Sequence, residues 1–166
     1  MKQRKRFILL AFIILLVGAS SYLFSFYRIF GNDMAPNIQQ GSYVVSYYTQ
    51  SIKTGDVIAY QRDNKIYVKR VLGLPGQKVD MDQSGNLFVD DQFVSEPYIE
   101  KLSLHPLSVS LPLEVTDGSY FVLGDNRAEA MDSRLDLVGL VKKEEILGKV
   151  VFNVFPFESF GLIRSK

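Results

Sequence analysis

The sequence contains no cysteine and only one histidine among its 166 residues. Without cysteine, disulfides, thiolate nucleophiles and cysteine-containing metal sites are excluded. The histidine, His105, precedes Pro106 in a polar stretch, which is typical of a surface residue. A zinc site would need mostly carboxylates, an unusual ligand set. We therefore expect no metal and no cofactor, and neither a Cys–His nor a Ser–His–Asp enzyme.

Acidic residues are absent from residues 1–28, which hold five basic ones. The whole chain has 19 Lys and Arg against 18 Asp and Glu, so the remainder is acidic overall. Binding to nucleic acid needs a basic face on the folded domain. The charge distribution therefore predicts no nucleic-acid partner and favours a basic tail beside a membrane.

An uncharged run of 21 residues extends from Phe7 to Tyr27. A bilayer core of ~30 Å is crossed by about 20 apolar helical residues, so the run predicts one transmembrane helix over residues 7–27. A cleaved signal peptide is the alternative, because small residues at 18–21 resemble its cleavage region. Aromatic residues continue the run beyond that point, as membrane interfaces favour, which indicates a retained anchor. The basic cluster predicts a cytoplasmic tail (residues 1–6) and an extracytoplasmic domain (28–166).

Beyond residue 28 the sequence is typical of short strands, rich in β-branched and aromatic residues. The predicted strands are 42–47, 57–60, 66–68, 87–89, 120–123 and 150–154, separated by turn signals at 53–56, 75–76, 83–86 and 116–118. This pattern predicts a mainly β domain, with a small coiled antiparallel sheet or barrel. We expect one short helical turn at 142–147, and a long surface excursion over the proline-containing residues 98–113.

Four segments carry the chemical information. They are Gly31-Asn32-Asp33-Met34-Ala35-Pro36, Gly55-Asp56-Val57-Ile58, Tyr67-Val68-Lys69-Arg70-Val71-Leu72-Gly73-Leu74-Pro75-Gly76, and Gly124-Asp125-Asn126-Arg127-Ala128-Glu129-Ala130-Met131-Asp132-Ser133-Arg134, the last followed by Gly139 and by 146–149. In this order, behind an N-terminal anchor, they resemble the type I signal peptidases over most of the chain after residue 30. An unrelated β-rich, membrane-tethered domain is the alternative interpretation.

The resemblance implies a signal-peptidase fold and a serine–lysine mechanism, in which a neutral lysine amine accepts the proton of a serine that attacks the scissile carbonyl. Carried over by position, Lys69 is the base, and Asp33 stands where the nucleophilic serine belongs. Ala130 replaces the serine that hydrogen-bonds the lysine, and Asn37 replaces a threonine. Other family positions are kept at Met34, Pro36, Asp132, Ser133 and Arg134.

These departures predict loss of proteolysis. A carboxylate beside Lys69 favours the ammonium form over the amine, and Asp33 would attack an amide only through a high-energy anhydride. Its charge also opposes the developing oxyanion. We therefore interpret Asp33 and Lys69 as a structural ion pair. Ser42, Ser46 and Ser133 are the nearest substitute nucleophiles, but none precedes the methionine.

The favoured hypothesis is a non-proteolytic relative that binds extended signal-peptide segments of exported preproteins by strand addition. Signal-peptidase-like proteins without the catalytic serine act as accessory factors in surface-pilus assembly of Gram-positive bacteria, so pilin subunits are the specific partners that the resemblance suggests. The alternative is an active type I signal peptidase, favoured by the retained Lys69. Membership of the Ser–Lys self-cleaving repressors is disfavoured by the anchor and by the lack of a helix-turn-helix segment.

Overall fold

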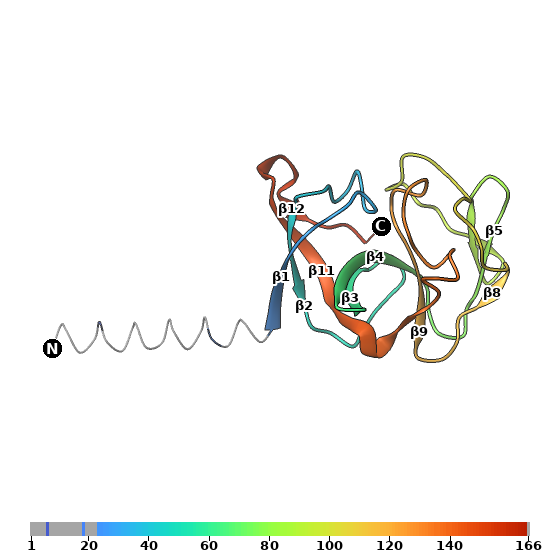
Figure 1. Cartoon of the computed structure of the whole chain (residues 1–166), viewed down its shortest axis with the longest axis horizontal. Helices are drawn as coiled ribbons and strands as arrows, with labels where there is room; N and C mark the ends of the chain where they lie inside the picture. The colour runs from blue at the N-terminus through green and yellow to red at the C-terminus, as the bar shows by residue number, and fades with distance from the viewer. Residues whose placement is uncertain (1–5, 7–17, 19–22, 166) are drawn as a thin grey trace.

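The computed structural model describes residues 6, 18 and 23–165, and the continuous part is built of antiparallel β-strands (Figure 1). The larger sheet has eight strands, in the order β1 (Phe24–Arg28), β2 (Tyr43–Tyr47), β11 (Ile146–Phe155), β3 (Val57–Arg62), β4 (Lys65–Gly73), β9 (Ser119–Leu123) and β10 (Val141–Lys142), with β12 (Gly161–Leu162) beside β11. The smaller sheet has the order β7 (Gln92–Phe93), β6 (Leu87–Val89), β5 (Lys78–Met81) and β8 (Leu113–Glu114). The prediction of a mainly β, antiparallel fold is confirmed.

Each of the six predicted strands coincides with an observed one: β2, β3, β4, β6, β9 and β11. Their apolar side chains fill three hydrophobic clusters, one between β1, β2, β3 and β4, one against the smaller sheet, and one around β3, β4 and β9. The same β-branched residues that gave the strand signal therefore form the core.

The helical turn predicted at 142–147 is wrong beyond Glu145. A 3-10 turn covers only Lys143–Glu145, and a second one covers Phe157–Ser159. Ile146 already pairs with Tyr60 of β3, so β11 begins where the helix was expected to continue. Pairing with the sheet satisfies this backbone better than one further helical turn would.

Most of the transmembrane helix predicted over residues 7–27 lies outside the described residues. Its last four positions, 24–27, belong to β1, which pairs with β2 from Phe24–Tyr47 to Arg28–Tyr43. The predicted range therefore extends too far, because an aromatic-rich run suits a strand edge as well as a membrane interface. Within the described part of the chain, no helix has the length and apolar character needed to cross a bilayer.

The excursion predicted at 98–113 forms neither strand nor helix until Leu113 in the described chain. Arg134, which is fully buried, holds it in place by donating to the backbone carbonyls of Ser103 (3.0 Å) and His105 (3.2 Å). Leu104 and Leu111 pack against the hydrophobic cluster of the smaller sheet. The excursion is thus irregular but firmly attached.

Candidate functional site

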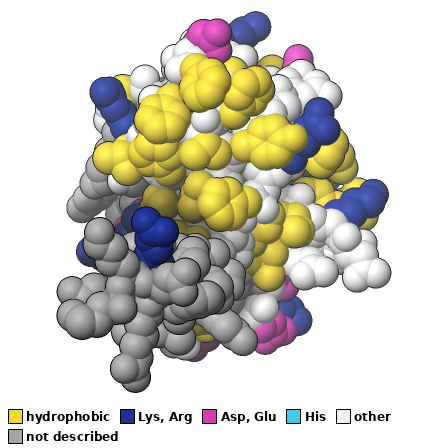
Figure 2. Space-filling view, turned by 90° about the vertical axis from the view of Figure 1, so that its left-hand side faces the viewer, with side chains coloured by type: hydrophobic (Ala, Val, Ile, Leu, Met, Phe, Trp, Pro, Cys, Tyr) yellow, Lys and Arg dark blue, Asp and Glu magenta, His cyan; other side chains and the backbone are white. Residues whose placement is uncertain are grey.

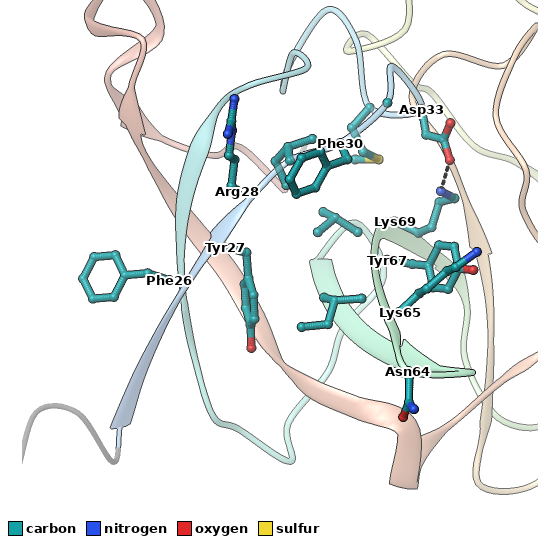
Figure 3. A pocket seen from close by; sticks show the side chains of 14 residues that line it. Phe26, Tyr27, Arg28, Phe30, Asp33, Asn64, Lys65, Tyr67 and Lys69 are labelled. Carbon is teal, nitrogen blue, oxygen red and sulfur yellow. Dashed lines mark hydrogen bonds and ion pairs between the residues drawn. The ribbon is translucent and has the colours of Figure 1, made fainter.

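The predicted ion pair is present: the Lys69 Nζ donates a hydrogen bond to the Asp33 Oδ2 (Figure 3). Lys69 lies on β4 and is 1% exposed, whereas Asp33 lies in the turn that follows β1 and its side chain is 35% exposed. The carboxylate therefore faces solvent on one side and covers the lysine on the other. The lysine headgroup is occupied by this partner.

Residues of the last motif segment support the Asp33 backbone. The Asn126 N–H donates to the Asp33 carbonyl (2.9 Å). A Cβ at Gly124 would lie 2.5 Å from that carbonyl and 2.3 Å from the Ala130 Cβ, so only glycine fits there. Ala130, which is fully buried, thus packs beside the Asp33 main chain. The structure brings Asp33 and Lys69 together, and Ala130 lies near the Asp33 main chain.

Met34 and Pro36 position the Asp33 turn. Met34 is 2% exposed and belongs to the hydrophobic cluster under β1 and β4. After the cis Ala35–Pro36 peptide bond, the Asn37 side-chain amide donates to the Asp125 carboxylate (2.9 Å) and to the Tyr98 carbonyl (2.7 Å). The turn is therefore fixed by the core on one side and by a polar network on the other.

That network contains residues to which the sequence assigned no role. Arg70, next to Lys69, makes two hydrogen bonds to the Asp125 carboxylate, at 2.8 and 2.7 Å, and its guanidinium lies 4.0 Å from the Tyr98 ring centroid. Arg127 is hydrogen-bonded to both carboxylate oxygens of Glu96. Arg70, Asp125 and Arg127 stood inside the recognised segments, which was the available signal, whereas Glu96 and Tyr98 lay in a stretch with no motif.

Burial and charge shift the pKa values of this network. Burial alone would lower the pKa of Arg127, but hydrogen bonds and the charge of Glu96 raise it above its ordinary value. Burial, and then the charge of Glu96, raise the pKa of the Tyr98 phenol well above its ordinary range. Both groups therefore keep one protonation state throughout the physiological range.

Asp132, Ser133 and Arg134 support the fold and do not line the site. Arg134 donates two hydrogen bonds to the Asp132 carboxylate, each at 2.8 Å, and both side chains are fully buried. The Ser133 hydroxyl donates to the Gly139 carbonyl (2.7 Å) and accepts from the Val122 N–H (3.0 Å). The other two possible substitute nucleophiles, Ser42 and Ser46, are no more than 1% exposed. None of the three serines reaches the groove described next.

A groove of about 660 Å³ runs between β1 and the first half of β4 and ends at the ion pair (Figure 3). It is lined by residues 26–31, 33–34 and 64–69. β1 is the last strand of the sheet order, and β4 pairs with β9 only from Arg70 onward. Each wall therefore presents a strand edge without a ladder partner in the described chain. Two such edges can hydrogen-bond an extended peptide.

Exposed apolar side chains cover the neighbouring face, here called the apolar face. It consists of Phe24, Phe26, Phe30, Tyr43, Phe155 and Phe157, each at least 43% exposed. Figure 2 shows apolar side chains gathered on this side of the molecule. Contiguous apolar patches of this kind mark interaction surfaces.

Within residues 23–165, no cluster of three His, Asp or Glu side chains is arranged to hold a metal ion.

Comparison with known proteins agrees with the motif assignment. Residues 2–155 match the family described as "Signal peptidase, peptidase S26". The chain is 36% identical to a signal peptidase I of Bacillus licheniformis over 158 residues, which cover 87% of this chain and 84% of that protein. It is 33% identical to signal peptidase IB of Staphylococcus aureus (strain COL), over 92% and 88% of the two chains. A crystal structure of a signal peptidase I from Enterococcus faecalis is 30% identical, covers 60% of this chain and 96% of its own, and has a TM-score of 0.49.

Proposed function

The chain belongs to the signal peptidase family, peptidase S26, and we propose that it binds signal-peptide segments of exported proteins without cleaving them. The observation that carries this proposal is the Asp33–Lys69 ion pair at the end of the groove. Cleavage by a serine–lysine dyad needs a hydroxyl nucleophile and a neutral amine. Here a carboxylate occupies the nucleophile position and holds the lysine headgroup as its hydrogen-bond donor.

Binding of a peptide in the groove requires neither the hydroxyl nucleophile nor the neutral amine. The groove volume lies within the ~300–1,000 Å³ typical of ligand sites, and its walls are mostly apolar. An extended segment between β1 and β4 would gain main-chain hydrogen bonds from both strand edges, while its alternate side chains enter the groove. This mode suits signal peptides, in which an apolar region is followed by small residues at the cleavage site.

The proposed location is the cell membrane, with a single span, a cytoplasmic N-terminus and the β domain outside. The uncharged run over 7–27 and the basic residues before it support this topology. The apolar face supports it too, because β1 contains the last four residues of that run and exposed aromatic residues suit a membrane interface. Partners are exported preproteins, and pilin subunits in Gram-positive pilus assembly are the specific candidates suggested by the sequence resemblance.

An active signal peptidase is the second candidate function. Two observations favour it: the relatives that share 33% and 36% identity are named signal peptidases, and Lys69 is retained. In this case the Asp33 carboxylate itself would have to act as a catalytic group. The two candidates differ in one measurable product, a cleaved preprotein.

The experiment uses the purified full chain in lipid with a preprotein substrate. A photo-crosslinking amino acid at Phe30, which is exposed in the groove, should capture the preprotein, and no mature product should form. The matched control places the same group at Phe93, which is 62% exposed on the smaller sheet and away from the groove. Cleavage would overturn the non-proteolytic assignment, and equal capture at both positions would overturn binding in the groove.

A further inference from the structure

The groove carries an excess of positive charge. Four charged side chains line it, namely Arg28, Asp33, Lys65 and Lys69. Asp33 and Lys69 neutralise each other. Within residues 23–165 no carboxylate lies at ion-pair distance from Arg28 or Lys65. Two exposed cations without an acidic partner therefore stand in a groove that is otherwise mostly apolar.

Local packing keeps both cations available. The Arg28 guanidinium lies over the rings of Phe30 and Tyr43, at 5.4 and 5.9 Å from their centroids, contacts that leave its N–H donors free. Lys65 stands opposite Arg62 in the β3–β4 hairpin. Arg62 makes two hydrogen bonds to Glu145, at 2.6 and 2.7 Å, so Glu145 is already paired. Asp63 belongs to the same hairpin but forms no ion pair with Lys65 in the described chain.

The two cations lie on opposite walls of the groove, and Lys65 lies toward the hairpin end of β4, away from the ion pair. β1 and β4 run in the same direction, because each step from β1 through β2, β11 and β3 to β4 is antiparallel. Along β4, Lys65 precedes Lys69 by four residues, which is roughly 13 Å at about 3.3 Å per residue. Figure 3 shows Arg28 on the β1 side and Lys65 on the β4 side.

On the basis of the function proposed above, we propose that the bound segment is apolar and carries an acidic side chain about four residues from the residue that lies against Asp33 and Lys69. A carboxylate there would lie near Lys65 and neutralise part of the excess charge of the groove. A basic side chain at the same place would be repelled. Charge would then select among exported proteins whose apolar segments are otherwise alike.

The test measures binding of labelled extended peptides to the full chain in lipid nanodiscs. One apolar peptide is made with Glu, Gln or Lys at a single position, which is scanned along the sequence. At its best position the Glu peptide should bind roughly two- to fivefold more tightly than the Gln peptide, and the Lys peptide should bind more weakly than either. The difference should shrink as salt rises.

Variants assign the preference to the two cations. Lys65→Gln combined with Arg28→Gln should abolish the preference for Glu, and Lys65→Glu should shift it toward the Lys peptide. Lys101→Gln, at an exposed lysine outside the groove, should keep the wild-type preference. Both groove cations are exposed, so the substitutions should leave the circular dichroism spectrum unchanged.

Each outcome has a distinct meaning. Equal binding of the three peptides would overturn the charge preference and leave groove binding intact, whereas failure of every peptide to bind would overturn both. Vesicles with and without phosphatidylglycerol provide a further arm. If the double Gln variant loses binding to anionic vesicles but keeps the preference for the Glu peptide, the cations bind lipid headgroups and the inference is wrong.

Discussion

Replacing Asp33 by serine returns the missing hydroxyl and removes the carboxylate that accepts the Lys69 hydrogen bond. Lys69, which is 1% exposed, then no longer has its carboxylate partner. Both changes move the site toward a working dyad. We predict that Asp33→Ser gains weak signal-peptide cleavage and that Asp33→Ser with Ala130→Ser gains clearly more.

The difference between the two variants follows from the position of Ala130. Its Cβ and the Asp33 carbonyl lie at the same side of Gly124, so a hydroxyl at 130 would lie near the Asp33 main chain, and the family resemblance gives this position the role of orienting the lysine. Without that hydroxyl the lysine lacks an orienting partner. A misplacement of about 1 Å can cost on the order of 100-fold in rate, and a positioned general base contributes about 10²–10⁴-fold. The double variant should therefore be about 10- to 100-fold faster than Asp33→Ser.

The assay follows conversion of a preprotein to its mature form by the full chain in detergent or lipid. Lys69→Ala in the double-variant background is the control and should show no cleavage. The reasoning is refuted if the unmodified protein cleaves at a rate comparable to the double variant and Asp33→Ala abolishes that cleavage. A double variant that folds but is inactive would show that the groove has diverged, and peptide binding then becomes the decisive measurement.

Three further predictions concern stability and topology. Hydrogen bonds from Arg62 lower the pKa of Glu145 below its ordinary value of about 4.5. The ionised carboxylate therefore stabilises the fold above that pH, and this stabilisation is lost as the pH falls below it. The decrease in the free energy of unfolding between about pH 5 and pH 3, measured with urea, should be smaller in Arg62→Gln than in the unmodified protein. Arg134→Met leaves the buried Asp132 without its partner and should lower the free energy of unfolding by about 3–5 kcal/mol, whereas Lys78→Met, at an exposed pair, should change it little. Protease added to intact wall-stripped cells should digest the C-terminal domain, and full protection would contradict the proposed topology.

The strands that could be predicted from sequence are those whose apolar residues fill the core. Val57-Ile58-Ala59-Tyr60 is buried throughout, and its composition indicates a strand without further context. β5 was missed because Lys78 and Asp80 alternate with only two apolar residues. β1 was assigned to the membrane span because its aromatic residues suit either environment. Strand pairing decided both cases, and a single sequence does not reveal pairing.

The site was predicted to a different degree. Asp33 and Lys69 are 36 positions apart, and only the motif resemblance placed them together. The hydrogen bond from Asn37 to Asp125 and the contact of Arg70 with Tyr98 depend on how the turn after β1 meets the excursion. The composition and spacing of residues in the sequence do not show how the turn after β1 packs against the excursion. The sequence therefore located the Asp33–Lys69 pair and Met34, but not Glu96 and Tyr98, which belong to the polar network beside the pair.

Arg134 holds the excursion by hydrogen bonds to the excursion's main chain. Its guanidinium donates to the carbonyls of Ser103 and His105, and its carbonyl accepts from the N–H groups of Ser108 and Val109. Every amino acid except proline supplies both peptide groups. These hydrogen bonds therefore hold the path of this stretch whatever side chains stand at its exposed positions. For the protein engineer, exposed positions such as Glu100 and Lys101 are places to attach a fluorophore or an epitope without disturbing the fold.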